Sequence, residues 1–331
     1  MWIFQLACTI LSTSLNTLLI YLIIKKSSTN IGNYKFLMIY TSVFEALWGL
    51  FDFPADVKLH CHGHASLVFR EQSGGYPWIV LIYTGLFGAS LALFAVNFAY
   101  RYGAIEWKFG RKYTNGWILG LYFGIPVLIG LWWASAVGYG FQATLESQEY
   151  SRSSFSTHFN LSMENISYIS ANFYHSQYQN LLEMFNWPVW IGAFNLMVIV
   201  VGSLSCTFTF GYLCYQELAR KLSSNTSQQY AILQQQIFLS LVVQTAIPLS
   251  FMHIPITFYF VVPILNVNFD IFSNLFQTTI SLYPVVDPLP NFFIISNYRK
   301  SILRMIKCRW KRRSSQVQVN IMSVTISKLH V

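Results

Sequence analysis

Long uncharged apolar stretches dominate this chain, and the clearest of them runs from Trp78 to Phe98. A helix of about 20 apolar residues is long enough to cross the hydrocarbon core of a bilayer. Only 10% of the residues are charged and 54% are hydrophobic, whereas about 25% of the residues in a soluble domain are charged. The sequence therefore predicts an all-α membrane protein built as a bundle of helices.

The apolar stretches predict seven membrane-spanning helices. A signal peptide would place basic residues before its apolar run, and none precede the first stretch, so we count it as a span. We expect a transmembrane domain over residues 1–295 and a basic cytoplasmic tail over residues 296–331. The predicted spans are residues 2–24, 36–53, 78–100, 117–140, 187–215, 237–261 and 271–295.

The distribution of positive charge predicts how these spans are oriented. The segments after the first, third, fifth and seventh spans carry all but three of the 21 Lys and Arg residues, the exceptions being Lys58, Arg70 and Arg152. Cytoplasmic loops of membrane proteins are enriched in Lys and Arg. We therefore expect the N-terminus outside and the C-terminus in the cytoplasm. The net charge of +9 then reflects basic residues on the cytoplasmic side of the bilayer, and we expect no nucleic-acid partner.

Two kinds of covalent modification fit this orientation. The long outer segment 141–186 contains two N-x-Ser acceptors for N-glycosylation, at Asn160 and Asn165. Cys308 lies in the basic stretch after the seventh span, where a palmitoyl chain would reach the inner leaflet. The alternative for that stretch is that its basic residues only follow the inside-positive rule.

Motifs in the last two spans resemble one receptor family. Gln244 to Pro248, followed by Met252 to Pro255, is similar to the sixth helix of nematode Str-type chemoreceptors, which include the str and srj branches. Tyr283 to Pro288, followed by Asn297-Tyr298-Arg299, resembles the seventh helix of that family and its exit. Tyr100-Arg101-Tyr102 resembles the inner end of its third helix.

This resemblance implies a G-protein-coupled receptor with two partners, a small odorant-like molecule and a heterotrimeric G protein. It also implies the plasma membrane of a chemosensory cilium as the location, and neither a cofactor nor an enzymatic activity. No HExxH or GxSxG motif appears on the spans. The competing class is a small-solute transporter or channel, but such folds usually carry repeated halves, and the chain has no internal repeat.

The resemblance assigns G-protein coupling to the inner ends of the third and fifth spans. Arg101 is expected to contact the sixth helix at rest and the G protein in the active state. No acidic residue precedes it, so its restraint at rest must come from elsewhere, such as a hydroxyl or carbonyl of the sixth span, or be absent. The residues expected to take part in coupling are Tyr100, Arg101, Tyr102, Arg220 and Lys221.

Acids and prolines inside the spans suggest a hinge. Charged side chains inside a membrane are costly and usually have a partner or a role. Glu45 lies near mid-membrane, and Asp287 lies between two prolines of the seventh span. The simpler interpretation gives both acids a packing role. The functional one has Asp287 holding a kink, and the proposed hinge is then Pro248, Pro255, Pro284, Asp287 and Pro288.

Aromatic residues in the outer halves of the spans are candidates for a ligand site, although Trp and Tyr gather at membrane interfaces in any case. An aromatic, mostly apolar cavity suits a small volatile or lipophilic compound. His253 is the sharpest candidate because it is the one histidine within a predicted span. The full set of candidates is Asp52, Tyr83, Phe87, Trp190, Phe194, His253 and Tyr259.

The first outer loop contains the run His60-Cys61-His62-Gly63-His64. Imidazole and thiolate groups bind transition metals, but this spacing matches no standard site, so we expect no metal and a solvated loop. Cys61 has a second possible role, a disulfide with Cys8 near the outer end of the first span. The sequence leaves that question open.

Overall fold

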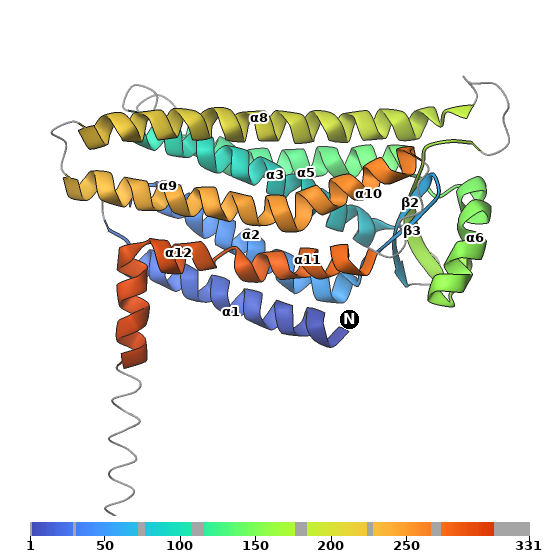
Figure 1. The fold of residues 1–331 in the computed structure, drawn as a ribbon, viewed down its shortest axis with the longest axis horizontal. Helices are drawn as coiled ribbons and strands as arrows, with labels where there is room; N and C mark the ends of the chain where they lie inside the picture. Colours follow the sequence, from blue (N-terminus) through green and yellow to red (C-terminus); the bar gives the residue numbers. More distant parts are fainter. Residues whose placement is uncertain are drawn as a thin grey trace, which may run out of the picture.

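The computed structural model describes residues 2–28, 31–71, 77–106, 116–175, 184–223, 228–265 and 273–307. Its long helices lie side by side in one bundle, as Figure 1 shows. Within the described ranges, six helices are long and apolar enough to cross a membrane. They are α1 (Trp2–Lys26), α2 (Tyr34–Ala55), α3 (Trp78–Ile105), α5 (Ile118–Gly140), α8 (Trp187–Ser223), and one path through α9 (Gln228–Pro248), η3 (Leu249–His253) and α10 (Ile254–Ile264).

The seventh helical segment is divided in two. The helix α11 spans Ser273–Val286, and α12 spans Leu289–Ile294. Proline has no N–H to donate and interrupts a helical hydrogen-bond ladder, and Pro288 stands at the break. After α12 the chain turns, and residues 296–307 form a helix that runs crosswise to the bundle (Figure 1).

The path formed by α9, η3 and α10 changes its winding where the sequence places Pro248. Residues Leu249–His253 form a single π-helical turn, and Pro255 lies in the first turn of α10. Such π turns inside α-helices are rare and occur frequently at functional sites. At the other end, α9 begins at Gln228, nine residues before the predicted start of the sixth span.

The helix α3 lies at the centre of the bundle and packs closely against α5. Small residues permit this approach: a Cβ added to Gly88 would lie 2.6 Å from the Cβ of Trp133. Gly85 and Gly130 face each other in the same contact, so that a Cβ on either one would meet the backbone oxygen of the other within 3 Å. Small residues at helix contacts are the usual means of close packing in membranes.

A compact cap covers one end of the bundle, and it was predicted only as polar loops. It contains the antiparallel strands β1 (Lys58–His62), β2 (Ala65–Glu71) and β3 (Ile166–Asn172), in the order β1-β2-β3, with α6 (Leu145–Phe159) and η2 (Met163–Asn165). Phe69 and Phe155 are fully buried between sheet and helix. We call this unit the cap; it lies at the same end of the bundle as the N-terminus (Figure 1).

The expectation of a solvated His60–His64 loop was therefore wrong. His60 and Cys61 belong to β1 and are 1% exposed. A tight turn follows, in which Gly63 adopts a φ of 54°, a conformation that glycine takes without steric cost. Burial under α6 explains the difference, because residues more than 80 positions away in the sequence supply the cover.

The α3–α5 contact provides a test of this packing. In a Gly130→Ala variant the new Cβ would lie 2.8 Å from the backbone oxygen of Gly85, and overpacking of this kind costs roughly 1–3 kcal/mol. We expect a lower Tm for the purified receptor in detergent. Gly124→Ala on the same helix is the matched control, because nothing lies within 4 Å of its added Cβ. Equal Tm values for the two variants would contradict this packing.

Candidate functional site

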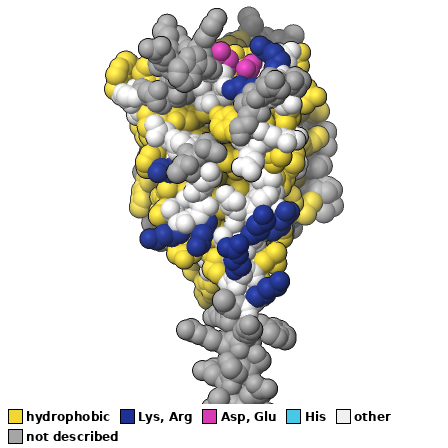
Figure 2. All heavy atoms as spheres, turned by 90° about the vertical axis from the view of Figure 1, so that its left-hand side faces the viewer, with side chains coloured by type: hydrophobic (Ala, Val, Ile, Leu, Met, Phe, Trp, Pro, Cys, Tyr) yellow, Lys and Arg dark blue, Asp and Glu magenta, His cyan; other side chains and the backbone are white. Residues whose placement is uncertain are grey.

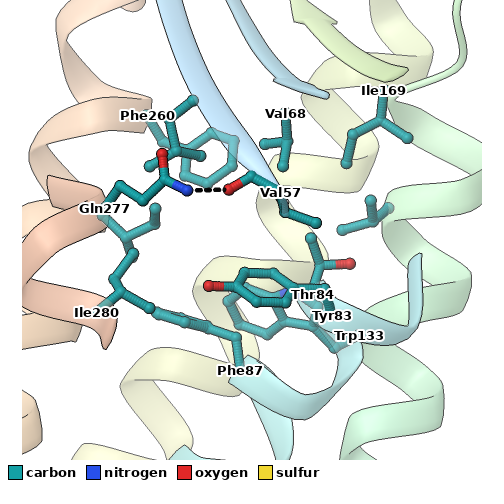
Figure 3. Close-up of a pocket in the computed structure, with 13 residues that line it drawn as sticks. Val57, Val68, Tyr83, Thr84, Phe87, Trp133, Ile169, Phe260, Gln277 and Ile280 are labelled. Atoms are coloured by element: carbon teal, nitrogen blue, oxygen red, sulfur yellow. Dashed lines mark hydrogen bonds between the residues drawn. The ribbon is translucent and has the colours of Figure 1, made fainter. Parts of the chain in front are cut away.

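Two neighbouring cavities lie where the cap meets the bundle. The first, the cap cavity, has a volume of about 40 Å³, and Figure 3 shows it between α3, α5, α10, α11 and the cap. Val57, Leu59 and Val68 of the cap form its roof, and Tyr83 and Phe87 form its floor. Gln277 of α11 donates a hydrogen bond of 2.7 Å to the backbone oxygen of Val57 (Figure 3), which ties this roof to the seventh segment.

The second, the lateral cavity, has a volume of about 120 Å³ and lies between α3, α5, α8 and α10. Phe87 and Trp133 line both cavities. Met197 and Val261 also line the lateral cavity, although their side chains are 56% and 39% exposed on the outside of the bundle. The lateral cavity therefore extends to the surface between α8 and α10, which would face lipid in a membrane.

His253 is the polar group of the lateral cavity. Its side chain is 6% exposed, and neither ring nitrogen has a hydrogen-bond partner among the described residues. The Thr257 hydroxyl, which also lines this cavity, donates to the backbone oxygen of His253 at 2.7 Å. The Phe87 ring packs edge-on at 4.8 Å between centroids. Leaving a buried polar group without a partner is costly, and this imidazole therefore has unused hydrogen-bonding capacity inside the cavity.

The other predicted ligand residues lie in different positions. Asp52 is buried beside the cap cavity, where its carboxylate accepts hydrogen bonds from Tyr83 at 3.0 Å and from Ser281 at 2.7 Å. Trp190 donates its indole N–H to the backbone oxygen of Phe173. Phe194 points outward from α8 and is 68% exposed, away from both cavities.

Tyr259 connects the bundle to the cap. Its hydroxyl accepts a hydrogen bond of 3.0 Å from the backbone N–H of His60 and lies 2.6 Å from the His60 oxygen and 2.5 Å from the Leu67 oxygen. Ser66 adds a hydrogen bond of 3.1 Å to the backbone oxygen of Tyr259. The outer part of the sixth helix is thus fixed to both β1 and β2.

Arg101 lies at the opposite end of the bundle and is completely buried. Its Nη2 donates to the backbone oxygen of Gln234 in α9 at 3.1 Å and also contacts the Gln234 side-chain oxygen. Its guanidinium lies over the Tyr34 ring, 5.0 Å from the centroid. Of the alternatives that the sequence left open, a carbonyl of the sixth helix is the one present. Sequence reasoning missed Gln234 itself, although the Gln234-Gln235-Gln236 run was a visible polar signal.

The remaining residues assigned to coupling surround this contact. Tyr100 is buried and packs on Tyr34 and Tyr122, and Tyr102 packs on Phe210. Lys221 donates to the backbone oxygen of Ile105, which fixes the end of α8 to the end of α3. Arg220 is exposed and forms an ion pair of 2.9 Å with Glu217. The basic residues Lys108, Arg111 and Lys112 lie outside the described ranges.

The break in the seventh segment is stabilised by other helices. Pro288 has no N–H, so it leaves the backbone oxygen of Pro284 without its helical partner, and Asn16 of α1 donates to that oxygen at 3.2 Å. Asp287 accepts a hydrogen bond of 3.0 Å from Gln244 of α9. The acid was expected to hold the kink, and in the structure it connects the sixth helix to the seventh segment beside that kink. Its carboxyl also faces that of Glu45.

The two predictions about cysteines have different outcomes. Cys8 and Cys61 are both buried thiols in the described part of the chain and are not joined by a disulfide. Cys8 is in α1 and Cys61 is in β1 of the cap. Cys308 lies outside the described residues, so its proposed palmitoylation stays a prediction.

The arrangement of these helices defines the class of the protein as a seven-helix receptor fold. The structure is similar to that of squid rhodopsin, with a TM-score of 0.53 over 92% of this chain and 84% of that one. Their sequences are 13% identical, so this likeness concerns the fold alone.

Sequence comparison then gives the family. The serpentine type 7TM GPCR chemoreceptor Str family matches residues 2–303, and the chain belongs to it. It is 30% identical over 309 residues to G-protein coupled receptor str-217 of Caenorhabditis elegans, covering 89% of this chain and 87% of that protein. It is 26% identical to Serpentine receptor class r-10 of Caenorhabditis briggsae over the same shares. The protein is thus a multi-pass G-protein-coupled chemosensory receptor and not an enzyme, as the sequence predicted.

The Arg101–Gln234 contact leads to a test of the resting state. A Gln234→Leu variant removes the side-chain acceptor, so Arg101 is held less firmly and the resting packing loses stability relative to the active one. We expect severalfold higher basal G-protein signalling at matched surface expression. Gln235→Leu is the control, because Gln235 is exposed on the same helix. Unchanged basal signalling in Gln234→Leu would show that this contact does not restrain the receptor.

Proposed function

We propose that this receptor detects a small, uncharged, mostly apolar molecule that binds in the lateral cavity and hydrogen-bonds to His253. The observation that carries the proposal is the pair of unpartnered, buried ring nitrogens of His253 in a cavity whose other lining residues, apart from Thr257, are apolar. An engineered cavity of about 150 Å³ binds benzene, so about 120 Å³ suits a molecule of that order. Its exposed edge at Met197 and Val261 favours a ligand that dissolves in lipid.

The sixth helix connects this ligand site to the proposed coupling site. His253 ends the π-helical turn η3, and Gln234, which holds Arg101, lies 19 residues earlier on the same continuous path. At helical rise this is roughly 28 Å. A ligand that favours one position of the sixth helix would shift the equilibrium between two packings of the bundle. In the active packing Arg101 leaves Gln234 and becomes available to a heterotrimeric G protein.

The charge distribution supports the proposed orientation, with the cap outside the cell and the C-terminal tail in the cytoplasm. Lys and Arg side chains gather at the end of the bundle opposite the cap, as Figure 2 shows. This basic surface includes Lys25, Lys26, Lys35, Arg299, Lys300, Arg304 and Lys307, all exposed. Such a surface suits the anionic inner leaflet. The domain division at residue 295, the plasma membrane and the chemosensory cilium belong to the same proposal.

Two substitutions, one at the proposed ligand site on the sixth helix and one on α3 at the proposed coupling site, test the mechanism. His253→Ala should weaken the potency of an active compound from a panel of small volatiles by roughly tenfold, because a buried hydrogen bond is lost, while basal signalling stays. Arg101→Ala should abolish the G-protein response while ligand binding stays within a few-fold. The measurement is a dose-response curve for each variant at matched surface expression.

The control for the first variant is Ser250→Ala, whose side chain is exposed in the same π-helical turn. If His253→Ala and Ser250→Ala respond alike, His253 is not a ligand contact. If Arg101→Ala signals normally, Arg101 only ends the third helix and has no part in coupling.

The orientation is tested by the glycan acceptors. Asn160 ends α6 and Asn165 lies in η2, and both are exposed on the cap. A glycosidase should increase the gel mobility of the wild-type receptor, and the Asn160→Gln/Asn165→Gln double variant should already migrate at that position. An epitope placed after Val331 should be labelled only in permeabilised cells. Labelling of intact cells would reverse the orientation.

A further inference from the structure

Four histidines gather in the cap. His60 and His62 project from β1, His64 follows in the turn to β2, and His158 comes from α6. The His60 ring lies 6.5 Å from that of His62 and 5.6 Å from that of His158, measured between centroids. The ligand site and the proposed coupling site do not use any of these side chains.

His60 is held in a place that suits only a neutral imidazole. It packs edge-on against Phe155 and Phe159, at 5.7 and 5.3 Å between centroids, and its Nε2 lies 3.0 Å from the Ser154 hydroxyl. Burial, together with the neighbouring His158 and His62, lowers the pKa of His60 to about 4. An imidazole in water has a pKa of about 6.5.

The other groups that face this cluster do little to offset the burial of His60. From α6, Tyr150 packs against His62 and His64, and Glu146 is near His64 and hydrogen-bonds to His175 at 2.6 Å. Burial still lowers the pKa of His64, against the effect of Glu146. From α10, the cluster meets the neutral hydroxyl of Tyr259 at the backbone of His60.

The position of His60 connects its protonation to the rest of the receptor. Its backbone N–H and C=O form the contact with Tyr259, which attaches the cap to α10. Leu59, the residue before His60 on β1, forms the roof of the cap cavity together with its strand partner Val68 on β2 and with Val57, which precedes β1. Any movement of β1 away from α6 therefore changes both the roof and the outer attachment of the sixth helix.

We propose that His60 binds a proton from the surrounding medium and that acid thereby loosens the cap from α6 and α10, so that this receptor also senses acidity. The direction follows from linkage. In an open cap the His60 imidazole lies in water and takes up a proton below about pH 6.5, whereas in the closed cap it resists protonation until about pH 4. The closed cap is thus fully stable near neutral pH and loses stability as the pH falls from about 6.5 to about 4.

Hydrogen exchange on the purified full-length receptor in nanodiscs tests this inference. After correction for the intrinsic pH dependence of exchange, amides of β1 and β2 should open about tenfold more at pH 5.5 than at pH 7.5, from His60 alone. A His60→Phe variant keeps an aromatic ring in the aromatic site but cannot bind the proton, so its corrected exchange should depend on pH much less than that of the wild type, with His64 as the remaining source.

Two further variants separate protonation from simple loss of a contact. Ser154→Ala removes the partner of His60 Nε2 but leaves the imidazole, so its acid dependence should persist. His158→Gln removes a neighbour that disfavours protonation of His60 in the closed cap, so the acid dependence should weaken; this variant also serves if His60→Phe does not fold. A wild-type cap with no acid dependence, or a His60→Phe cap with the wild-type dependence, would overturn the proposal.

This inference relies on the proposed function only in placing the cap outside the cell. The exchange measurement needs neither a ligand nor a known orientation. Its failure would remove the acid response and leave the receptor mechanism intact. Conversely, if the epitope and glycan tests reverse the orientation while acid still opens the cap, the proton site stands and the proposed function does not.

Discussion

The lipid bilayer requires each backbone polar group within it to find a partner in the protein, and this requirement shapes the whole structure. Helices meet it along most of their length, so the informative positions are those where a helix breaks. The backbone oxygen of Pro284, which lost its helical partner at Pro288, is bound by Asn16 from a different helix. The break in this span is therefore stabilised by a contact from a neighbouring helix and depends on where that helix lies.

A similar requirement for partners applies to the charged side chain buried at the inner end of the bundle. Arg101 is fully covered and would be costly there without acceptors. Gln234 supplies a backbone and a side-chain oxygen from the sixth helix, and the Tyr34 ring supplies its face. Because these acceptors are neutral, the contact is weaker than an ion pair with a carboxylate would be. In the proposed mechanism this contact holds the resting state, and a moderate shift of α9 releases it.

The sequence predicted the features that depend on local composition and missed those that depend on long-range contact. The seven apolar stretches, the clusters of basic residues and the family could all be predicted, because each depends on residues that are close together in the sequence. The cap was not, since β1 and β3 belong to one sheet although about 100 residues separate them. Gln234 was missed for a similar reason: the partner of Arg101 is 133 positions away, and a glutamine gives no sign of which residue it will meet. His253 could be named as a candidate because a lone imidazole in an apolar span is conspicuous, and the structure places it in the lining of the lateral cavity.

The sixth helix is where these long-range contacts converge. Its outer part is attached to the cap through Tyr259, its π-helical turn presents His253 to the lateral cavity, and its inner part holds Arg101 through Gln234. Asp287 adds a third attachment, to Gln244. A rigid helix with three attachments would transmit any displacement at once, but Pro248 and the π turn lie between the outer attachment at Tyr259 and the two inner ones. In the proposed mechanism the outer part therefore adjusts to a ligand or to the cap by small amounts, and only a displacement large enough to move α9 reaches Arg101.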